Sequence, residues 1–365
     1  MSFDLIRKYY KKQGYNIDEK YNFFYDETNN NIKYQFKNDK IPNLDDFIKK
    51  YRLGGIVLKK ESINYDFDNL EKSLNLKNEL KINSINTQKT DTFLNCLRGK
   101  RLELILDFIC SNDILIHIYS FDNLYDVVIE IIDSLIMEEF LDIYDYLAPI
   151  MKNDLYKFVK NDLKRFMNYL KRYNYPNIES ENIYDFCNDM YIWIDESVQK
   201  DFGLECCRQL FRTYRKKEKL LFLNGNKEKV IIDGYTEINF DMCLKFSKSF
   251  HFFDEITEVK KNLKKFPVDN YDFGDSASNF TLQLSDVIVG LLDRFFEYID
   301  NTNCKDLEKE LKNLKGIQKD NLIKFLNLYN KSVNENELFF GFYEPIDIVN
   351  YRNSIIYSLI TAFNL

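Results

Sequence analysis

The sequence is poor in the residues and motifs on which many enzymes depend. Only two of its 365 residues are histidines, His117 and His251, so a Ser-His or Cys-His nucleophile would have to use one of them. His117 lies in the strand-like segment ILIHIYSF, which favours a core or sheet position, and no nucleophile motif lies near His251. The GxxxxGK phosphate loop and the GxGxxG turn are both missing. If the chain is an enzyme, its chemistry therefore has to rest on carboxylates.

The cysteines lack the spacing of a metal site. There are seven of them, an odd number, and no CxxC pair occurs. This pattern disfavours both a zinc site and a disulfide framework. We therefore expect reduced, mostly buried thiols in a cytoplasmic protein.

Long apolar segments are also missing. No run reaches the about 18 consecutive apolar residues that a transmembrane helix needs. The N-terminal segment MSFDLIRKYYKKQGYN is too polar for the apolar region of a signal peptide. The sequence therefore predicts neither a membrane span nor a membrane partner.

Basic residues are not in excess. The chain has 51 Lys and Arg against 58 Asp and Glu, which gives a formal net charge of -7. A whole-domain basic surface for nucleic acid is therefore excluded, although local basic strips are not. Hydrophobic residues make up 45% of the chain, which is enough to build a core.

The hydrophobic pattern predicts a mixed fold. Strand-like runs occupy 22–27, 32–37, 53–60, 114–121 and 229–233, with turn residues between the early ones. A helical pattern separates the third run from the fourth, and a long apolar helix follows the fifth. The resulting order is β-β-β-α-β, helical insertion, β, α, helical tail. We predict an α/β (α+β) protein with an RNase H-like mixed sheet.

The same pattern divides the chain into three parts. Residues 1–121 and 223–300 should form the RNase H-like core, with 122–222 as a helical insertion outside the sheet. Residues 301–365 look wholly helical and should form a C-terminal region. We expect the strands that contain Phe24, Ile56, His117 and Ile231 to lie in one sheet.

Four acidic residues stand out because their settings are apolar: Asp26, Glu79, Asp233 and Asp286. Asp286 lies in LQLSDVIVGLL, a helix that is apolar nearly all round and so should be buried. A buried carboxylate has to lose its charge or find a partner. Carboxylates that converge repel one another, and a Mg²⁺ or Mn²⁺ ion removes that repulsion. The alternative is that each acid is a helix cap, a turn residue or a salt-bridge partner.

Four segments share their order and character with a known family. They are FFYDETNNN, LGGIVL, NELK and DSASNFTLQLSDVIVG. Together they resemble a widespread bacterial family of unknown function, "DUF thirty-eight hundred". That family carries a Y-x-D-E-S-G strand end, a GG strand, an E-x-K element and an L-Q-L-A-D helix. The similarity covers the first 85 residues and about 230–295.

The resemblance implies an RNase H-like, metal-dependent nuclease with a defined set of residues. The implied catalytic acids and metal ligands are Asp26, Glu79, Asp233 and Asp286. The implied supporting or phosphate-binding residues are Glu27, Lys81 and Gln283. Thr28-Asn29 replaces the family's Ser-Gly, and Ser285 replaces its Ala. Asp195-Glu196 in YIWIDES mimics the opening motif, but we interpret it as helix surface.

Two functional hypotheses follow. The first is a nuclease that hydrolyses phosphodiesters of DNA or RNA with two Mg²⁺ or Mn²⁺ ions about 3.5–4 Å apart. The resemblance adds a role in bacterial defence against phage. The second is a catalytically degenerate RNase H-like module that binds a protein partner, or dimerises, through its helical regions.

Overall fold

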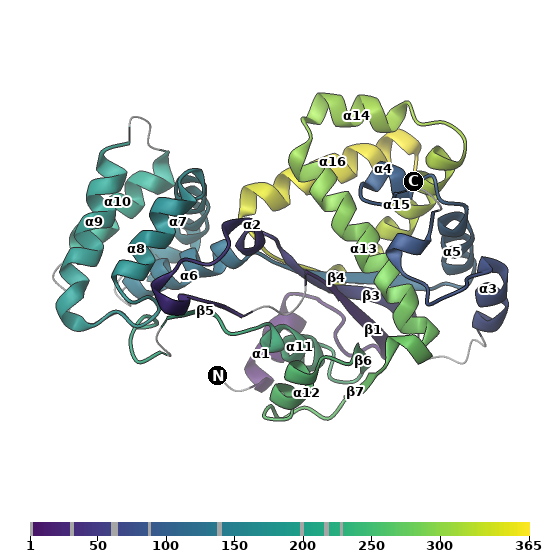
Figure 1. The fold of residues 1–365 in the computed structure, drawn as a ribbon, viewed down its shortest axis with the longest axis horizontal. Helices are drawn as coiled ribbons and strands as arrows, with labels where there is room; N and C mark the ends of the chain where they lie inside the picture. The colour runs from purple at the N-terminus through teal and green to yellow at the C-terminus, as the bar shows by residue number, and fades with distance from the viewer. Residues whose placement is uncertain are drawn as a thin grey trace.

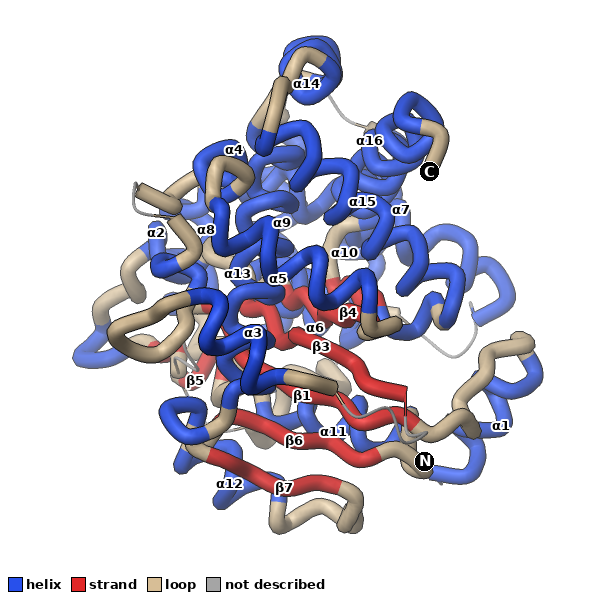
Figure 2. The backbone as a smooth tube through the Cα atoms, turned by 90° about the vertical axis from the view of Figure 1, so that its right-hand side faces the viewer, coloured by secondary structure: helices blue, strands red, loops and turns tan. Residues whose placement is uncertain are grey.

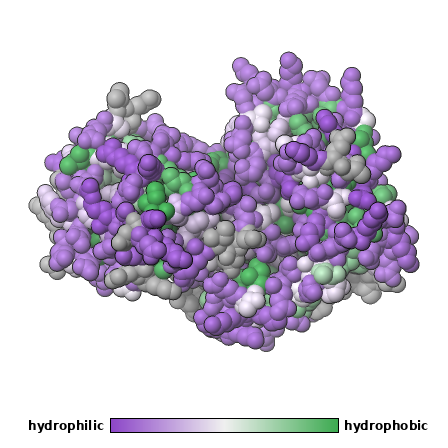
Figure 3. All heavy atoms as spheres, in the orientation of Figure 1, coloured by the Kyte–Doolittle hydropathy of each residue, from purple (hydrophilic) through white to green (hydrophobic). Residues whose placement is uncertain are grey.

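The computed structural model describes residues 3–29, 33–59, 65–86, 89–136, 141–197, 201–214, 219–226 and 229–365. A central sheet carries helices on both faces, and a group of helices projects from it as a separate lobe (Figure 1). The molecular surface is hollowed between this helical lobe and the rest of the molecule (Figure 3).

The central sheet is mixed and has six strands in the order β7-β6-β1-β3-β4-β8. β1 (Tyr21–Thr28), β3 (Tyr51–Lys59) and β4 (Leu115–Phe121) pair antiparallel in the middle. β6 (Phe250–Asp254) lies parallel to β1, and β7 (Tyr271–Gly274) lies parallel to β6. The mixed α/β class predicted from the sequence is confirmed.

The fifth predicted strand is not in this sheet. β5 (Val230–Ile232) pairs with β2 (Tyr34–Gln35) in a separate two-stranded sheet, so the expectation that Ile231 shares a sheet with Phe24 is wrong. β5 has only three residues, and the place beside β1 is taken by β6. The sequence FHFFD of β6 alternates exposed or half-buried residues with buried ones, as expected for a strand with two unlike faces.

The C-terminal region is not wholly helical. α14 (Cys304–Lys312), α15 (Ile317–Glu335) and α16 (Ile346–Phe363) are helices as predicted. Between the last two, however, β8 (Phe340–Tyr343) pairs parallel to β4 and forms one edge of the central sheet. Its sequence FGFY has the aromatic residues typical of strands. Residues 301–365 therefore complete the core and are not an appendage to it.

The two faces of the sheet pack against different sets of helices. Tyr21, Phe23 and Tyr25 of β1 are buried on one face, in a core shared with α6 (Asn123–Leu135), α11 (Thr236–Lys245) and α12 (Thr257–Leu263). The opposite face packs with the helices α3 (Phe67–Leu74), α4 (Phe93–Cys96), α5 (Lys100–Ser111), α13 (Phe280–Asn301), α15 and α16. Phe24 points to this second core, as the two-residue period of a strand requires.

The predicted insertion is helical and lies to one side of the sheet. After α6 it contains α7 (Leu141–Asn161), α8 (Leu163–Arg172), α9 (Ile183–Asp195) and α10 (Phe202–Tyr214), which form the lobe on the left of Figure 1. No strand occurs in the described residues between 122 and 222, as predicted. Asp195 ends α9 and pairs with Arg208 at 3.1 Å, so Asp195-Glu196 lies on the helix surface as predicted. The short helices α1 (Phe3–Lys12) and α2 (Leu44–Phe47) complete the fold.

A buried network of charges connects β3, α13 and α16. The side chain of Arg352 is 1% exposed and contacts Asp300 at 2.6 Å and Glu344 at 2.9 Å. Lys50 contacts the same two carboxylates at 2.9 and 2.5 Å. These positive charges lower the pKa of Glu344 against the effect of burial. Such a network is costly to break, because each partner left behind is a buried charge.

We predict that Arg352→Met destabilises the protein strongly. The free energy of unfolding should fall by roughly 3–5 kcal/mol, since Glu344 would stay buried with Lys50 alone. As a matched control, Lys49→Met removes the exposed Lys49–Asp46 pair and should cost less than about 1 kcal/mol. Urea unfolding of the three proteins measures both effects. Equal stability of the two variants would show that the network is not coupled to folding.

Both histidines are buried and neutral. The hydroxyl of Tyr25 donates to Nδ1 of His251 at 2.7 Å, and Nε2 of His251 donates to the Phe246 carbonyl at 3.2 Å. His117 donates from Nε2 to the Phe24 carbonyl at 3.1 Å, and its buried Nδ1 has no hydrogen-bond partner. Burial lowers the pKa of His251 to about 3 and that of His117 to about 4. The core position expected for His117 is confirmed.

We predict a stability loss in acid that His117→Phe reduces. Below a pH of about 6.5 a histidine is protonated in the unfolded chain but stays neutral in the folded protein. The free energy of unfolding therefore falls as the pH drops toward 4. Each such histidine adds about 1.4 kcal/mol per pH unit to the slope. His117→Phe keeps the ring, and the Phe24 carbonyl still accepts from Ser285. The free energy of unfolding, measured at pH 7, 6 and 5, should change with pH less steeply in His117→Phe than in the wild type, by the equivalent of one bound proton. The same slope in both proteins would contradict a neutral, buried His117.

Candidate carboxylate site

Two neighbouring parallel strands each carry an aspartate at the same level. The register pairs Phe24 with Phe252 and Tyr25 with Phe253. The next residues along the two strands are Asp26 in β1 and Asp254 in β6. Because both follow the last paired residues of parallel strands, their side chains project to the same face of the sheet. That face is the one on which Phe24 meets α13.

α13 brings a third aspartate to this point. The side chain of Asn279 caps the helix by accepting from the backbone of Thr281 and Leu282. One turn later, Ser285 donates to the Phe24 carbonyl at 3.1 Å and accepts from the Ile56 backbone at 3.3 Å. These bonds fix the helix against β1 and β3. Asp286 follows Ser285 and lies close enough to Asp26 for its charge to raise the pKa of that aspartate.

Gly55 makes this approach of the helix to the sheet feasible. A Cβ at this position would collide with the Phe24 carbonyl and with the Ser285 side chain. Its φ of 154° is also a conformation that favours glycine. The packing of α13 against β3 thus explains why glycine occupies position 55 in the strand.

Glu79 and Lys81 lie on a loop that is bonded to α13. The Leu80 backbone donates to Gln283 Oε1 at 2.9 Å, and the Ile82 backbone donates to Asp286 Oδ1 at 2.7 Å. Lys81 Nζ lies 3.3 Å from Glu79 Oε2, and its side chain is 54% exposed.

Gln283 has a structural part in the site. Its side chain is buried, and its Nε2 donates to the Ser276 carbonyl at 2.9 Å while its Oε1 accepts from Leu80. Both ends of the amide are therefore engaged. The structure places Gln283 as a bridge between two loops, and the predicted contact with phosphate falls to Lys81 alone.

The carboxylates repel one another in a partly buried setting. Burial, followed by the charges of Glu27, Asp286 and Asp254, raises the pKa of Asp26 to about 8. Burial and the charges of Asp254 and Asp286 raise the pKa of Glu27 to about 7. The pKa of Asp286 is also raised by burial, against the opposing bond from Ile82. Burial is the largest cause of each shift, and the neighbouring carboxylates add to the shifts of Asp26 and Glu27.

No cation neutralises the three aspartates directly. Within the described part of the chain, no lysine or arginine forms an ion pair with Asp26, Asp254 or Asp286. Lys81 acts on Asp286 and Asp26 only at longer range. The contrast with the compensated charges around Arg352 indicates that these acids do not serve to stabilise the fold.

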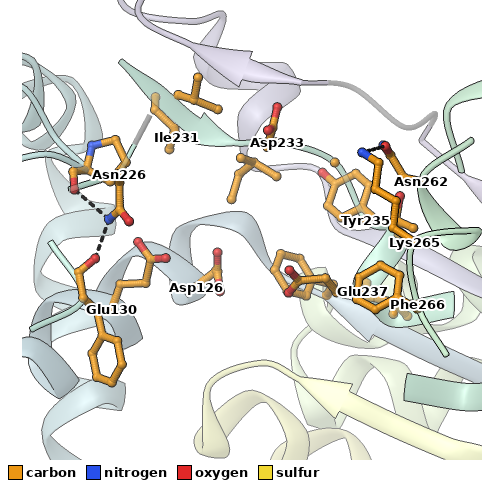
Figure 4. A pocket seen from close by; sticks show the side chains of 18 of the residues that line it. Asp126, Glu130, Asn226, Ile231, Asp233, Tyr235, Glu237, Asn262, Lys265 and Phe266 are labelled. Atoms are coloured by element: carbon orange, nitrogen blue, oxygen red, sulfur yellow. Dashed lines mark hydrogen bonds between the residues drawn. The ribbon is translucent and has the colours of Figure 1, made fainter. Parts of the chain in front are cut away.

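The structure does not bring Asp233 into this group. Asp233 follows β5, is exposed, and pairs with Lys33. It lines a cavity of about 740 Å³, across from Asp126 and Glu130 of α6 (Figure 4). Its inclusion among the metal ligands is therefore wrong. The error follows from assigning β5 to the central sheet, since a strand outside the sheet cannot deliver its last residue to β1.

Asp254 takes the place that was predicted for Asp233. Its Oδ1 accepts from the backbone of Ser276 at 3.2 Å and of Glu255 at 2.9 Å. A signal for it is present in the sequence, because HFFDE at 251–255 repeats the pattern of FFYDE at 23–27. In both segments an aromatic strand ends in Asp-Glu.

The donor chemistry of the site fits a hard divalent cation. All the candidate ligands are carboxylate oxygens, the type that Mg²⁺ and Mn²⁺ prefer. The buried hydroxyl of Thr28, two residues beyond Asp26, has no hydrogen-bond partner among the residues that the structure describes. Nevertheless, no three Asp, Glu, His or Cys side chains in the described ranges are grouped closely enough to hold an ion as they stand. Ion binding therefore requires the carboxylates of Asp26, Asp254 and Asp286 to turn toward one another.

Comparisons of the chain with protein-family models, with curated proteins and with solved structures find no match. The resemblance of its motifs to "DUF thirty-eight hundred" therefore stays a prediction. Among the helices that the structure describes, none is both long and apolar enough to cross a membrane.

We predict that Asp26→Asn stabilises the metal-free protein at neutral pH. With a pKa of about 8, caused by burial and by the charges of Glu27, Asp286 and Asp254, the carboxyl of Asp26 has to take up a proton when the protein folds at pH 7. The amide keeps the shape of the side chain without that cost. The gain should be at least on the order of 1 kcal/mol, the equivalent of one pKa unit. Thermal melts in chelator at pH 7 measure it. Asp233→Asn, at an exposed position outside the group, is the control and should change the melting temperature little.

Proposed function

We propose that the chain is a divalent-metal-dependent nuclease whose active site contains Asp26, Asp254 and Asp286. One observation carries the proposal. Three acids from two parallel strands and a buried helix approach one another with no ion pair among the described residues. Chemistry that needs only carboxylates and a cation is consistent with a chain that has two histidines, both buried in its core. Glu27 and Glu79 complete the acidic set.

In this proposal each residue of the site has a definite task. Bound Mg²⁺ or Mn²⁺ would activate a water and stabilise the leaving oxygen of a phosphodiester. Asp26 and Asp254 would hold the cations from the sheet, and Asp286 would hold them from α13. The Ile82 backbone keeps Asp286 oriented through its bond to Oδ1. Lys81, largely exposed beside Glu79, would contact the substrate phosphate as a point charge.

The strand order supports an RNase H-like architecture. Three antiparallel strands lie beside one another, and β6 and β7 extend the sheet on the β1 side. We therefore retain the RNase H-like assignment, and with it the implied role in bacterial defence, as part of the proposal. The net charge of -7 disfavours tight non-specific binding to nucleic acid, which depends on phosphate neutralisation. A narrow class of substrate, or a partner that delivers it, fits this charge better.

The proposed place of action is the cytoplasm. None of the seven cysteines, all of which the structure describes, forms a disulfide, and four of them are buried. Free thiols are typical of a reducing compartment.

A second function has some support from the surface of the helical regions. Tyr146 and Phe202 of the insertion and Tyr357 of α16 are between 64% and 75% exposed. Large exposed apolar side chains are typical of protein interfaces when they gather in a patch. An interaction module of this kind would have no use for the uncompensated acids at Asp26 and Asp286. The two functions are also compatible, because the helices lie away from the carboxylates.

We predict metal-dependent cleavage of nucleic acid that Asp26→Asn and Asp254→Asn abolish. Each change removes a charge that would hold a cation, so the rate should fall at least about 100-fold, as loss of several kcal/mol implies. The measurement is cleavage of labelled DNA and RNA, single- and double-stranded, with Mg²⁺, Mn²⁺ or chelator. Asp233→Asn is the matched control and should cleave like the wild type.

A second readout does not depend on activity. If the site binds Mg²⁺ or Mn²⁺, either ion should raise the melting temperature of the wild type, because a ligand of the folded state stabilises it. Asp286→Asn should lose most of that increase while folding normally in chelator. A wild type that gains nothing from either ion, and cleaves nothing, would rule the nuclease out.

A further inference from the structure

One half of the sheet face that holds the carboxylates is lined by aromatic rings. In β6, His251 and Phe253 point to the buried face, where His251 stacks on Phe23. Phe250 and Phe252 therefore point to the opposite face, together with Asp254. Their ring centroids lie 6.4 Å apart and the rings are inclined by 26°. We call Phe250 and Phe252 the aromatic ledge.

The ledge is not part of either hydrophobic core. Phe253 and Tyr271 belong to the core below β6, whereas neither Phe250 nor Phe252 belongs to that core or to the one under α13. Phe250 is 40% exposed, a high value for a phenylalanine in a strand. Phe252 is half-buried and its ring meets that of Phe24 edge-on, with centroids 5.9 Å apart, whereas burial does not explain a phenylalanine at position 250.

The helices leave this half of the face open. α13 packs on β1 and β3 through Ser285, and its first residues reach Gly274 of β7. Figure 2 shows β6 and β7 at the lower margin of the sheet, in front of α11 and α12, with no described helix drawn over them. The ring of Phe252 lies over Gly274, where any side chain would collide with it. The ledge thus rests on the sheet with its other side toward solvent.

The ledge leads directly to the carboxylates. Phe252 pairs with Phe24, and Asp254 and Asp26 are the next residues on the same face. Two residues of a strand span about 6.6 Å, so Phe250, Phe252 and Asp254 follow one another along this face of β6 at about that spacing. At the other end, Lys20 precedes β1 and Lys248 precedes Phe250. Both lysines are exposed, and Lys248 has a single ion pair at 3.4 Å, with Asp18.

We propose that the aromatic ledge binds single-stranded nucleic acid, with unpaired bases stacked on Phe250 and Phe252. The backbone then runs from Lys20 and Lys248 toward Asp26 and Asp254. This inference rests on the proposed nuclease function and names its substrate as single-stranded. Exposed aromatic side chains on an open sheet bind bases in this way in other proteins.

Two physical reasons select a single strand over a duplex. The faces of duplex bases are covered by their neighbours, so only an unpaired base can offer its face to a ring. Stacking also depends little on charge, and it can supply affinity that a chain with a net charge of -7 does not obtain from phosphates.

The test is binding of a short fluorescent single-stranded oligonucleotide, as DNA and as RNA, measured by anisotropy in chelator so that nothing is cleaved. Phe250→Ala and Phe252→Ala should each weaken binding about 5- to 150-fold, the effect of losing one stacked base. Phe250→Tyr keeps the ring and should bind like the wild type. Tyr184→Ala removes an aromatic side chain that is 53% exposed on α9 and should leave the affinity unchanged. A matching duplex should bind weakly to all of these proteins.

The outcomes separate this inference from the proposed function. If Phe250→Ala weakens binding but the wild type never cleaves, single-strand binding by the aromatic ledge is supported and the proposed nuclease function is contradicted. If the wild type cleaves but Phe250→Ala binds and cleaves normally, binding by the aromatic ledge is contradicted and the nuclease function is supported. Equal binding of duplex and single strand, or no binding by the wild type, would also overturn the ledge.

Folding and assembly have to be checked beside the binding. Phe250 is partly exposed, so Phe250→Ala should keep the melting temperature of the wild type. If Phe252→Ala does not fold, Phe250→Ala alone still tests the proposal. A wild-type dimer that Phe250→Ala converts to a monomer would show that the ledge is a protein interface and would overturn the proposal. Light scattering after size exclusion measures this.

Discussion

The contact of α13 with the middle of the sheet is the constraint on which the site depends. The hydroxyl of Ser285 bonds to both β1 and β3, and Gly55 offers no side chain that would hold the helix away. The loop that carries Glu79 and Lys81 is then bonded to the same helix through Gln283 and Asp286. A larger residue at position 55 would therefore disturb the helix, the loop and the spacing of the acids together.

α13 also separates two uses of acidic residues along its length. Asp293, Glu297 and Asp300 lie toward its C-terminal end, and each is paired with Arg52, Arg352 or Lys50. Asp286, two turns before Asp293, has a backbone bond and no ion pair in the described structure. The cost of grouping it with Asp26 and Asp254 falls on the stability of the fold. This division on one helix is the strongest physical argument that the first acid is retained for chemistry.

The sequence predicted those parts whose signals are local. β1, β3, β4 and the apolar helix around Asp286 have long, clear patterns and lie where expected. β6 and β8 are short aromatic segments inside regions dominated by helix, and their place in the sheet depends on pairing with residues more than 200 positions away. Pairing at that distance leaves no mark in periodicity. Asp26, Glu79 and Asp286 lie beside local signals of this kind. Asp254 was missed because it ends β6, and Asp233 was included because it ends β5, which lies outside the central sheet.

The edge strand β8 has a consequence for the order in which the protein can be made. β4 leaves the ribosome more than 200 residues before β8, the strand that pairs with its outer side. Until then one edge of the sheet has unpaired backbone groups, and such edges attract other chains. Arg352, on the helix that follows, joins Lys50 beside β3 only at that late stage. The nascent chain therefore carries its uncompensated acids and an unpaired β4 edge until residues 340–352 have been made, when β8 covers that edge and Arg352 completes the charge network.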